Sequence, residues 1–451
     1  MHAMMQRRPV RLLPALLFVF LLAAVETVRA QDPVDIGVVT GHRRDTFPLY
    51  VPEFQVQPGS MQQLPENLFA QVVSNDLQLS GFFRPPDNVQ FARETHQGDL
   101  QRGEIQFAEW YRIGVLYLVR GEYTIVDGEL RVEVRVYDTV AGSYIFGNLY
   151  PNNRPEQARA LAHQISNDIF KRITGYDGVA DTQILYVQQA DSLGRTKQIG
   201  IMDADGYGMR TLTPGGELTA TPAWGARGTE IYYTTYRDFN PDLEGMILRT
   251  QQRWWVSRRN GFNLSPAWNE ALQLIALTLT KDGNSEIYTI DREGRNPRRL
   301  TNNPAIDSSP CWSRDNSQLV FTSDRTGSPQ IYKMNADGSG QQRLTYQGRY
   351  NDAAVWSPAG PERIAYASRV SDGTFQIFTC NPDGSDVRQL TSGGSNNEDP
   401  TWSPNGLLLA FTSDRGGRKQ IYIMFAADGS NVHRLTNGSP CHSPAWSPMK
   451  H

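Results

Sequence analysis

The sequence predicts an α/β N-terminal domain followed by an all-β six-bladed β-propeller that the C-terminal strand closes. A tryptophan with a proline two residues before or after it recurs at intervals of 44, 44, 44, 46 and 44 residues. A period of this length is typical of stacked or circular repeat arrays. The composition also changes near residues 175–181, where a mixed helix and strand pattern gives way to short strands. The repeated tryptophans are Trp224, Trp268, Trp312, Trp356, Trp402 and Trp446.

Each repeat contains the segments of four antiparallel strands. Residues 319–325 match residues 409–415, and residues 330–338 match the segment that begins at residue 420. These short β-branched and aromatic runs are separated by Asp-Gly, Ser-Pro and glycine-rich turns, with no helix signal between them. The pattern predicts one propeller blade per repeat.

The last tryptophan predicts how the ring closes. Trp446 lies in a first-strand motif that no further strands follow, whereas residues 184–213 supply three strands that no first strand precedes. We therefore expect the last strand of the chain to complete the blade that begins at residue 184. Closure of this kind removes the exposed strand edges that an open array would leave.

The first 30 residues predict a secretory signal peptide. Arginines at positions 7, 8 and 11 precede an apolar run over residues 12–25, and the segment ends in Val28-Arg29-Ala30. The run is short for a bilayer-spanning helix, which needs about 20 residues. We expect an exported, soluble mature chain without a transmembrane segment, starting near Gln31. Cleavage of the signal peptide removes four arginines and one glutamate, so the net charge changes from −3 to −6. A negative net charge argues against a nucleic-acid partner.

The remaining chain divides into a domain at residues 31–178 and a propeller at residues 179–451. Apolar residues at spacings of 3 and 4 predict a helix over residues 64–79. A second long helix, residues 155–174, begins at a proline and ends before Gly175. The other predicted elements are strands at 34–39, 49–54 and 144–149, a helix at 106–113, and a hairpin of 116–125 and 130–137 around Asp127-Gly128.

Sequence motifs for catalysis are absent. The chain has no GxSxG, HExxH, GxxxxGK[ST] or strand-linked GxGxxG motif, and its seven histidines are scattered. We therefore predict no enzyme activity and no catalytic, cofactor-binding or metal-binding residues. Cys311, Cys380 and Cys441 occupy non-equivalent positions in their blades and are predicted to be buried thiols, with a single disulfide as the alternative.

Two repeated features have structural interpretations that outweigh functional ones. The tryptophans are predicted to be apolar wedges between blades, and the Asp-Gly pairs to be turn residues. Ser-Asp-Arg at residues 323–325 and 413–415 is expected to tie strand ends together within a blade, with surface recognition as the alternative.

One constellation points to a binding surface. In a ring, the residues four positions before each tryptophan gather at one mouth of the central channel. Asp352, Glu398 and the adjacent Asp399 could hold a hard cation there through oxygen ligands. A solvated acidic rim is the favoured interpretation. The six rim positions are Ala220, Leu264, Ser308, Asp352, Glu398 and His442.

The order of these segments resembles the TolB family, the periplasmic propeller component of the Tol-Pal system. The resemblance covers nearly all of the mature chain and rests on a signal peptide, an α/β domain and a six-bladed propeller closed by the last Trp-Ser-Pro strand. The segments similar to the family are residues 36–39, 75–77, 80–83, 110–114, 399–406 and 410–415.

The resemblance implies a periplasmic, non-enzymatic and monomeric adaptor without cofactors. It implies a role in outer-membrane integrity, envelope constriction during cell division and protein import. The inter-blade loops would bind Pal, a peptidoglycan-associated lipoprotein, and the mature N-terminus would bind TolA, an inner-membrane-anchored protein. The candidates for the Pal-type partner are Phe262, Ser265, Ser308, Asp352 and Glu398, and those for the TolA-type partner are Gln31, Asp32, Val34 and Ile36.

Two departures from the family affect these expectations. Phe262 stands where the family often has a polar residue, and the second blade has Trp254-Trp255 and Arg258-Arg259 in place of the usual closing strand. The alternatives are a secreted propeller hydrolase or lyase with acid and base residues around the channel, and a glycan- or peptide-binding module. Exposed aromatic residues at the channel mouth, such as Tyr236, Phe239 or Tyr350, would favour the latter.

Overall fold

The computed structural model describes residues 46–61, 63–88, 105–191 and 193–450. The predicted signal peptide, the N-terminal segment with Gln31, Asp32, Val34 and Ile36, and the predicted strand at 34–39 lie outside the described residues. Within the described part of the chain, no helix is long and apolar enough to cross a membrane.

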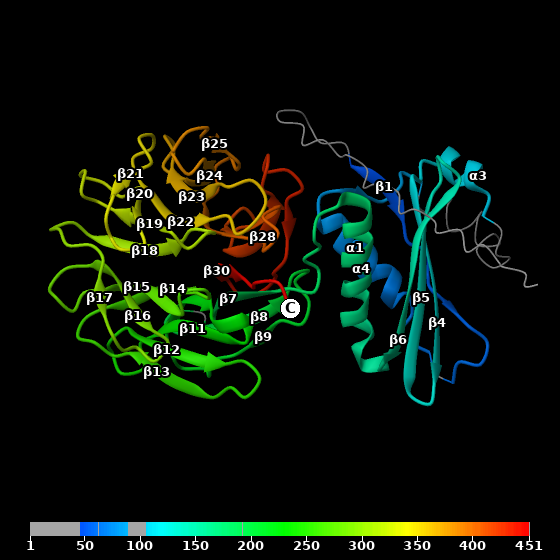
Figure 1. Cartoon of the computed structure of the whole chain (residues 1–451), viewed down its shortest axis with the longest axis horizontal. Coiled ribbons are helices and arrows are strands. Elements are labelled where there is room, and N and C mark those ends of the chain that lie inside the picture. The colour runs from blue at the N-terminus through cyan, green and yellow to red at the C-terminus, as the bar shows by residue number, and fades with distance from the viewer. Residues whose placement is uncertain (1–45, 62, 89–104, 192, 451) are drawn as a thin grey trace, which may run out of the picture. The chain divides into compact units, whose positions relative to one another are not determined.

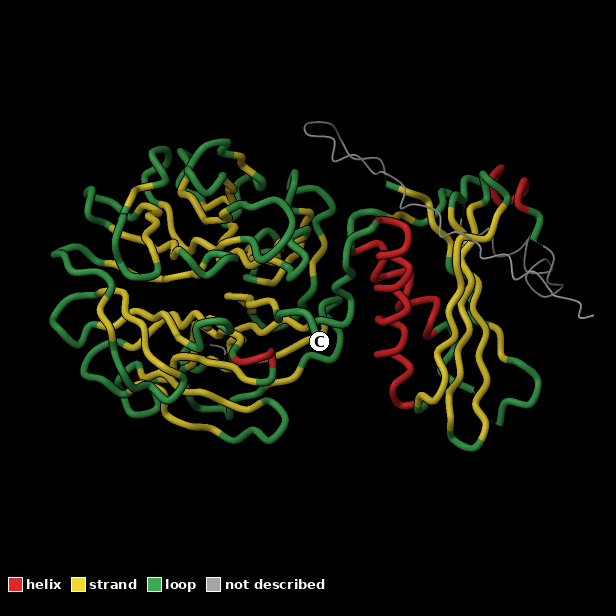
Figure 2. The backbone as a smooth tube through the Cα atoms, viewed as in Figure 1, coloured by secondary structure: helices red, strands yellow, loops and turns green. Residues whose placement is uncertain are grey.

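The N-terminal domain is a twisted sheet covered by two helices (Figures 1 and 2). The strands follow the order β3-β1-β4-β5-β6, and β2 also pairs with β4. The elements are β1 Phe47–Tyr50, β2 Gln55–Val56, α1 Leu68–Leu79, β3 Phe83–Arg84, α3 Phe107–Arg112, β4 Tyr117–Val126, β5 Glu129–Asp138, β6 Ser143–Asn153, a 3-10 turn Pro155–Gln157 and α4 Ala158–Thr174.

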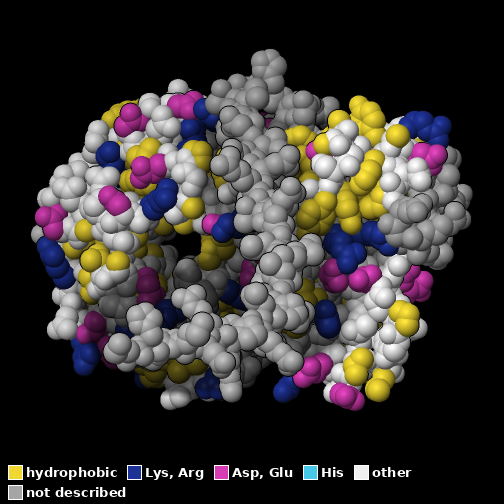
Figure 3. Space-filling view, turned by 45° about the vertical axis from the view of Figure 1, so that its right-hand side comes forward, with side chains coloured by type: hydrophobic (Ala, Val, Ile, Leu, Met, Phe, Trp, Pro, Cys, Tyr) yellow, Lys and Arg dark blue, Asp and Glu magenta, His cyan; other side chains and the backbone are white. Residues whose placement is uncertain are grey.

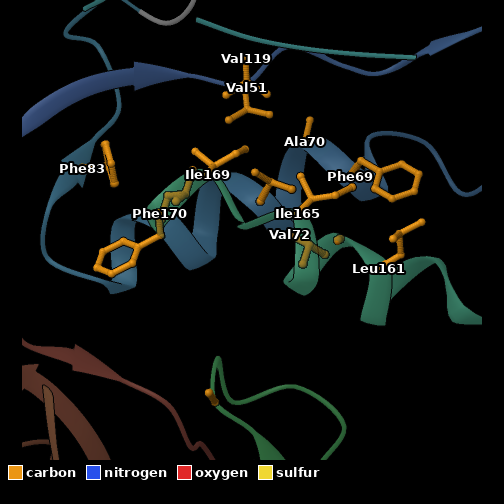
Figure 4. Packing of buried hydrophobic residues seen from close by; sticks show 14 of the residues in the cluster. Val51, Phe69, Ala70, Val72, Phe83, Val119, Leu161, Ile165, Ile169 and Phe170 are labelled. Atoms are coloured by element: carbon orange, nitrogen blue, oxygen red, sulfur yellow. The ribbon is translucent and has the colours of Figure 1, made fainter. Parts of the chain in front are cut away.

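Apolar spacing explains why α1 and α4 pack on the sheet. Phe69, Val72 and Val73 of α1 are buried together with Ile165 and Ile169 of α4 (Figure 4). The hairpin of β4 and β5 turns at Asp127, whose φ of 52° is left-handed, and Gly128. The predicted hairpin and long helices are confirmed, although α1 begins at Leu68 rather than residue 64.

The second part of the chain is a ring of six four-stranded sheets. The blades are numbered along the chain and their strands are ordered from first to fourth. Blade 1 is β30 Cys441–Trp446, β7 Gln183–Gln189, β8 Lys197–Asp203 and β9 Arg210–Thr211; blade 2 is β10 Thr219–Trp224, β11 Glu230–Thr235, β12 Asp242–Ile247 and β13 Arg253–Ser257; blade 3 is β14 Asn263–Asn269, β15 Leu274–Leu279, β16 Glu286–Asp291 and β17 Arg298–Arg299. Blade 4 is β18 Asp307–Trp312, β19 Gln318–Ser323, β20 Gln330–Asn335 and β21 Gln342–Arg343; blade 5 is β22 Asn351–Trp356, β23 Ile364–Arg369, β24 Phe375–Cys380 and β25 Arg388–Gln389; blade 6 is β26 Asn397–Trp402, β27 Leu408–Ser413, β28 Gln420–Phe425 and β29 His433–Arg434.

The predicted six-bladed ring and its closure are confirmed. Strand β30 pairs antiparallel with β7, with Trp446 opposite Ile184 and Cys441 opposite Gln188. Beside this pair, the Ser447 N–H donates to the carbonyl of Gln183 at 2.8 Å. The last strand of the chain is therefore the first strand of the first blade.

The tryptophans join neighbouring blades, as predicted. The indole N–H groups of Trp224, Trp312 and Trp402 donate to backbone carbonyls of the preceding first strand, at 2.8, 3.0 and 3.1 Å. These three side chains therefore fill apolar space between blades and satisfy their one donor there, whereas Trp268 and Trp356 donate to Glu270 and Glu362 of their own blades.

The Ser-Asp-Arg segments tie strand ends within a blade, also as predicted. Arg325 bonds to Asp307 at 2.9 Å and to the hydroxyl of Ser323 at 2.8 Å. The equivalent Arg415 bonds to Asn397 at 2.8 Å. Recognition by these arginines would require breaking their bonds within the blade.

The three thiols are free and largely buried. Burial raises the pKa of Cys380 and of Cys441 to about 11. Both therefore carry the neutral thiol at ordinary pH, which fits small apolar core residues.

A candidate partner-docking face

One end of the propeller carries both the inter-blade loops and the turns between second and third strands. The Ile306 N–H, in an inter-blade loop, donates to the carboxylate of Asp324, in such a turn, at 2.8 Å. Asn396 and Asp414 repeat this bond two blades further on, also at 2.8 Å. We call this end of the propeller the loop face.

A repeated β-bulge sets the inner edge of the loop face. Every first strand shifts register against its neighbour between the residues four and one positions before the tryptophan, and the bulge residue three positions before the tryptophan is left-handed. Five of the six bulge residues precede a proline. A bulge re-aims side chains at the end of a strand. The bulge residues are Thr221, Ser265, Ser309, Ala353, Asp399 and Ser443, with φ of 46, 50, 54, 55, 52 and 50°.

The six predicted rim residues each lie directly before a bulge residue. Because each first strand contacts the first strand of the next blade around the ring, the structure brings the six positions together as expected. All six residues are half-buried. The inner rim is therefore set by strand backbone and does not consist of free loops.

The acidic residues of the rim already have partners. Asp352 accepts bonds from the hydroxyl of Thr322 at 2.7 Å and from the Ala353 N–H at 2.6 Å. Glu398 forms an ion pair with Lys419 at 2.5 Å. Burial raises the pKa of Asp352, and the negative charge of Asp399 adds to this rise. The prediction of a solvated acidic rim was wrong in this respect, because these carboxylates are half-buried and have donors from a second strand, at Thr322, and from a turn, at Lys419.

The cation hypothesis finds no support at the rim. Within the described ranges, the one grouping of three ligand atoms from His, Cys, Asp or Glu lies elsewhere, at Asp76, His163 and Asp205. The rim also has positively charged neighbours. Burial, together with the charges of Lys197 and Lys419, lowers the pKa of His442 to about 4. Acidic and basic side chains are likewise interspersed over the surface in view in Figure 3.

The three candidates carried over for the Pal-type partner lie on the loop face. Phe262 is 52% exposed immediately before β14, and its N–H donates to the hydroxyl of Thr280 at 2.7 Å. Ser265 occupies the bulge of the same strand, and Ser308 lies before the bulge of the next blade. These side chains therefore belong to two neighbouring blades.

Several strongly exposed apolar residues that sequence reasoning did not place also lie on this face. Phe239 is 98% exposed in the turn between β11 and β12 and has a left-handed φ of 65°. Tyr346 and Ile306, in inter-blade loops, are exposed as well. Tyr350, by contrast, packs edge-on against Phe375 at 5.5 Å. The sequence shows Phe239 as an aromatic residue inside a polar turn. Whether such a side chain is exposed depends on how the neighbouring loop packs, and the turn sequence does not show this.

The Phe239 turn is fixed to the loop that carries Phe262. Arg258 forms an ion pair with Asp238 at 2.6 Å, and the Asn263 N–H donates to the Pro241 carbonyl at 2.9 Å. The two exposed phenylalanines thus project from connected segments of the loop face.

The second blade keeps a closing strand despite its unusual sequence. Strand β13 has five residues, four of them paired with β12, whereas the closing strands of the other blades have two residues. The guanidinium groups of Arg237 and Arg258 both stack on the ring of Trp255, at 4.9 and 4.5 Å from its centre. Cation–π contacts of this kind stabilise the longer strand.

Two family models match separate parts of the chain. A family model described as the TolB amino-terminal domain matches residues 35–145, and one described as the TolB beta propeller domain matches residues 170–450. A curated relative, the Tol-Pal system protein TolB of Desulfosudis oleivorans, is 30% identical over 256 residues. That match spans 56% of this chain and 57% of the length of the relative.

A solved structure supports the same relationship over a longer span. The crystal structure of TolB from Acinetobacter baumannii superimposes with a TM-score of 0.77 and 25% identity. It covers 91% of this chain and 99% of its own. Because the propeller model alone matches more than half of the sequence, the chain belongs to the TolB family.

Proposed function

We propose that this chain is a non-enzymatic periplasmic adaptor of a Tol-Pal envelope system. In this proposal the loop face docks a Pal-type peptidoglycan-associated lipoprotein, and the segment with Gln31, Asp32, Val34 and Ile36 binds a TolA-type inner-membrane-anchored protein. The adaptor would act as a monomer in outer-membrane integrity and in constriction during cell division. The proposal includes an exported chain with a signal peptide at 1–30, an N-terminal domain at 31–178 and a propeller at 179–451.

The observation that carries the proposal is the set of exposed apolar side chains on the loop face. Phe239, Phe262, Ile306 and Tyr346 are each more than half exposed there. Exposed apolar groups are typical of protein–protein interfaces, where aromatic residues contribute much of the binding free energy. Phe239 has a left-handed backbone and is 98% exposed, so its phenyl ring contributes little to folding and is available for contact with a partner.

The rigidity of the ring supports docking by a folded partner. The rim positions are fixed by paired strands and repeated bulges, so binding orders few groups. A preorganised surface keeps more of its contact free energy as affinity. The N-terminal segment offers the complementary mode, since an extended peptide can add to a sheet edge through backbone bonds.

The test is calorimetric titration of residues 31–451 with the soluble domain of the Pal-type lipoprotein from the same cell. We expect saturable binding that the double variant Ser265→Arg and Ser308→Arg loses, because two long cations would be placed inside the contact. We also expect Phe239→Ser with Phe262→Ser to weaken binding at least about tenfold, since buried aromatic anchors contribute 2 kcal/mol or more.

The matched control places the same substitutions at the other end of the blades. Ser339 and Ser385 lie exposed in turns between third and fourth strands of neighbouring blades. The Ser339→Arg and Ser385→Arg variant should bind like the wild type. Equal loss in both arginine variants would attribute the effect to charge or folding and would contradict the proposed site.

A second candidate follows from the exposure of Phe239. Exposed aromatic side chains also serve glycan- or peptide-binding modules, which stack rings on their ligands. If the wild-type chain does not bind the lipoprotein domain but binds peptidoglycan fragments through Phe239, the adaptor proposal is replaced by this one. The hydrolase or lyase alternative has less support, because Asp352 and Glu398 are engaged in bonds within the rim.

A further inference from the structure

A buried ionic cluster lies outside the loop face and has no role in the proposed function. Asp76 belongs to α1 and His163 to α4. The imidazole Nδ1 lies 2.8 Å from Asp76 Oδ2, and the Ser166 hydroxyl donates to the same oxygen at 2.7 Å. The side chains of His163 and Asp76 are 5% and 2% exposed. A charged pair at this depth requires favourable partners.

The second carboxylate of the cluster comes from the first blade of the propeller. Asp205 lies in the turn between β8 and β9, and it forms an ion pair with Arg159 of α4. The Arg159 guanidinium also stacks on the ring of Tyr207, 3.7 Å from its centre, in the same turn. One ligand atom each of Asp76, His163 and Asp205 lies within 4.8 Å of the others. The cluster therefore connects the two helices of the N-terminal domain to blade 1.

The cluster borders a small space with apolar walls. A cavity of about 40 Å³ is lined by Asp76, Ser166 and Asp205 together with apolar side chains such as Phe170 and Trp446. Asp76 Oδ1 and His163 Nε2 have no hydrogen-bond partner among the described residues. In such surroundings the electrostatic balance of the cluster is decided by its own groups, since solvent screens them little.

The charges near the imidazole come from three elements. They are Asp76 of α1, Asp205 of the blade-1 turn and Arg159 of α4 itself. The carboxylates of Asp76 and Asp205 and the guanidinium of Arg159 together carry a net charge of about −1. A protonated His163 brings the net charge of the cluster to about zero. Burial disfavours the charged imidazole, but the hydrogen bond and charge of Asp76, together with Asp205, raise the pKa of His163 above its ordinary value. Burial likewise raises the pKa of Asp76, against the opposing effect of His163 and Ser166.

We propose that His163, Asp76, Asp205 and Arg159 form a proton-operated latch between the N-terminal domain and the first blade. The protonated imidazole is hydrogen-bonded to Asp76 of the N-terminal domain and attracts Asp205 of blade 1 through its charge. When His163 loses its proton, two desolvated carboxylates face one remaining cation, and the blade-1 turn is held less tightly. Two uncharged hydrogen bonds also join these domains. The side-chain amides of Asn431 and Asn405 donate to the backbone carbonyls of Gln78 and Asp177, at 3.1 and 2.8 Å. Deprotonation of His163 therefore loosens the contact at the blade-1 turn without separating the domains.

The direction of the pH dependence follows from linkage. The pKa of His163 is raised on folding, so the native state binds more protons than the unfolded chain above the ordinary imidazole pKa of 6.5. The contribution of the latch is complete below that value and is lost as pH rises through the raised pKa. The raised pKa of Asp76 acts in the same direction.

The test combines histidine titration with hydrogen exchange on residues 31–451. The Cε1 proton resonance of His163, assigned by its absence in His163→Gln, should titrate above the ordinary imidazole range. Amide protection of the turn at residues 203–207, corrected for the intrinsic pH dependence of exchange, should fall over the same pH interval. In Asp205→Asn the His163 midpoint should move down, and protection should be low throughout.

Blade 4 offers a matched control for the aspartate. Asp337 occupies the equivalent turn and accepts a backbone bond from Ser339 at 2.9 Å, as Asp205 does from Tyr207 at 3.0 Å. Asp337→Asn should leave the His163 midpoint unchanged. A wild-type midpoint at or below the ordinary imidazole value, or no shift in Asp205→Asn, would overturn the latch.

A metal ion is the competing occupant of the same groups. Calorimetry with Zn²⁺ alone at pH 7.5, where the imidazole would need to be neutral to ligate, distinguishes the two. We expect no saturable binding that depends on His163, because Arg159 already neutralises Asp205. Stoichiometric zinc binding that His163→Gln abolishes would replace the proton latch with a metal site.

Discussion

At the scale of single residues, local partners decide the protonation of the channel rim. Asp352 and His442 occupy equivalent positions in two first strands. Burial favours the neutral form of each side chain, so it raises the pKa of Asp352 and lowers the pKa of His442. Lys197 and Lys419 add to the effect on His442. The loop face therefore carries fewer charges at its inner rim than its sequence indicates.

His442 should make the protein less stable in mild acid. Its pKa of about 4 in the folded chain lies below the ordinary 6.5, so the unfolded chain binds more protons between these values. The free energy of unfolding should therefore fall as pH drops from 6.5 toward 4. In His442→Gln, urea unfolding at stepped pH should show a smaller fall, corresponding to about one proton fewer taken up on unfolding.

Lys197→Met provides the companion variant. Removal of this cation should move the acid-sensitive interval upward, because His442 then keeps its proton to a higher pH. Identical slopes for wild type and His442→Gln would show that this histidine titrates normally in the folded chain.

At the scale of structural elements, the Asp-Gly turns join blades as well as reverse the chain. Gly338 has a φ of 90°, and a Cβ added there would meet the Leu300 carbonyl of the preceding blade at 2.5 Å. Gly206, Gly384 and Gly429 make the same approach to Leu435, Leu344 and Leu390. The prediction of turn residues was correct but incomplete, since glycine is required here for close packing between backbones as well as for a positive φ.

Gly338→Ala should therefore destabilise the propeller more than the conformation alone explains. Gly327 is the matched control, since its φ of 93° is similar and nothing lies within 4 Å of the added Cβ. We expect Gly327→Ala to cost about 1–2 kcal/mol in free energy of unfolding from backbone strain. Gly338→Ala should cost about 1–3 kcal/mol more from overpacking against Leu300. Equal urea midpoints and slopes for the two variants would remove the inter-blade contribution.

At the scale of the whole molecule, one strand closes the ring and stabilises both of its neighbours. β30 pairs with β7 in blade 1 and contacts β26 and β10 on either side. The indole of Trp446 donates to Thr182 at 2.8 Å, next to the start of β7. The two ends of the propeller sequence are therefore held in one sheet.

Deletion of residues 441–451 should open the ring. β7 would become an exposed edge, and the apolar contacts of Leu185 and Val187 with the neighbouring blade would be uncovered. We expect a lower melting temperature, a broader transition and concentration-dependent association in size-exclusion chromatography. Deletion of residues 449–451 alone keeps β30 and should melt like the full chain. A sharp, unshifted transition for the longer deletion would show that closure contributes little.

The sequence predicted much of the fold because its signals are periodic and local. The spacing of the six tryptophans fixed the number of blades, and the unmatched Trp446 strand fixed the closure. The turn at Asp127-Gly128 and the apolar face of residues 155–174 located the hairpin and the long helix. Each of these signals depends on a few neighbouring residues, so one sequence is sufficient to recognise them.

The candidate site was predicted less completely, because contacts between blades have no local signal. Asp352 and Glu398 were recognised as rim residues, but not their bonds to Thr322 and Lys419. Phe239 was noted as an aromatic residue whose exposure the turn sequence could not settle. The pairing of Asp238 with Arg258, which fixes the Phe239 turn beside Phe262, joins segments from different parts of the blade.

The sequence by itself determined the architecture of this protein: a mixed α/β domain, six four-stranded repeats and a C-terminal strand that completes the first blade. Strand periodicity, turn chemistry and a repeat length of 44 residues encode these features along the chain. Only the tertiary structure decided which charges are neutralised, which aromatic residues remain exposed and how His163 meets Asp205. Those outcomes depend on burial and on partners that lie far apart in sequence, and both are set when the blades and helices pack together.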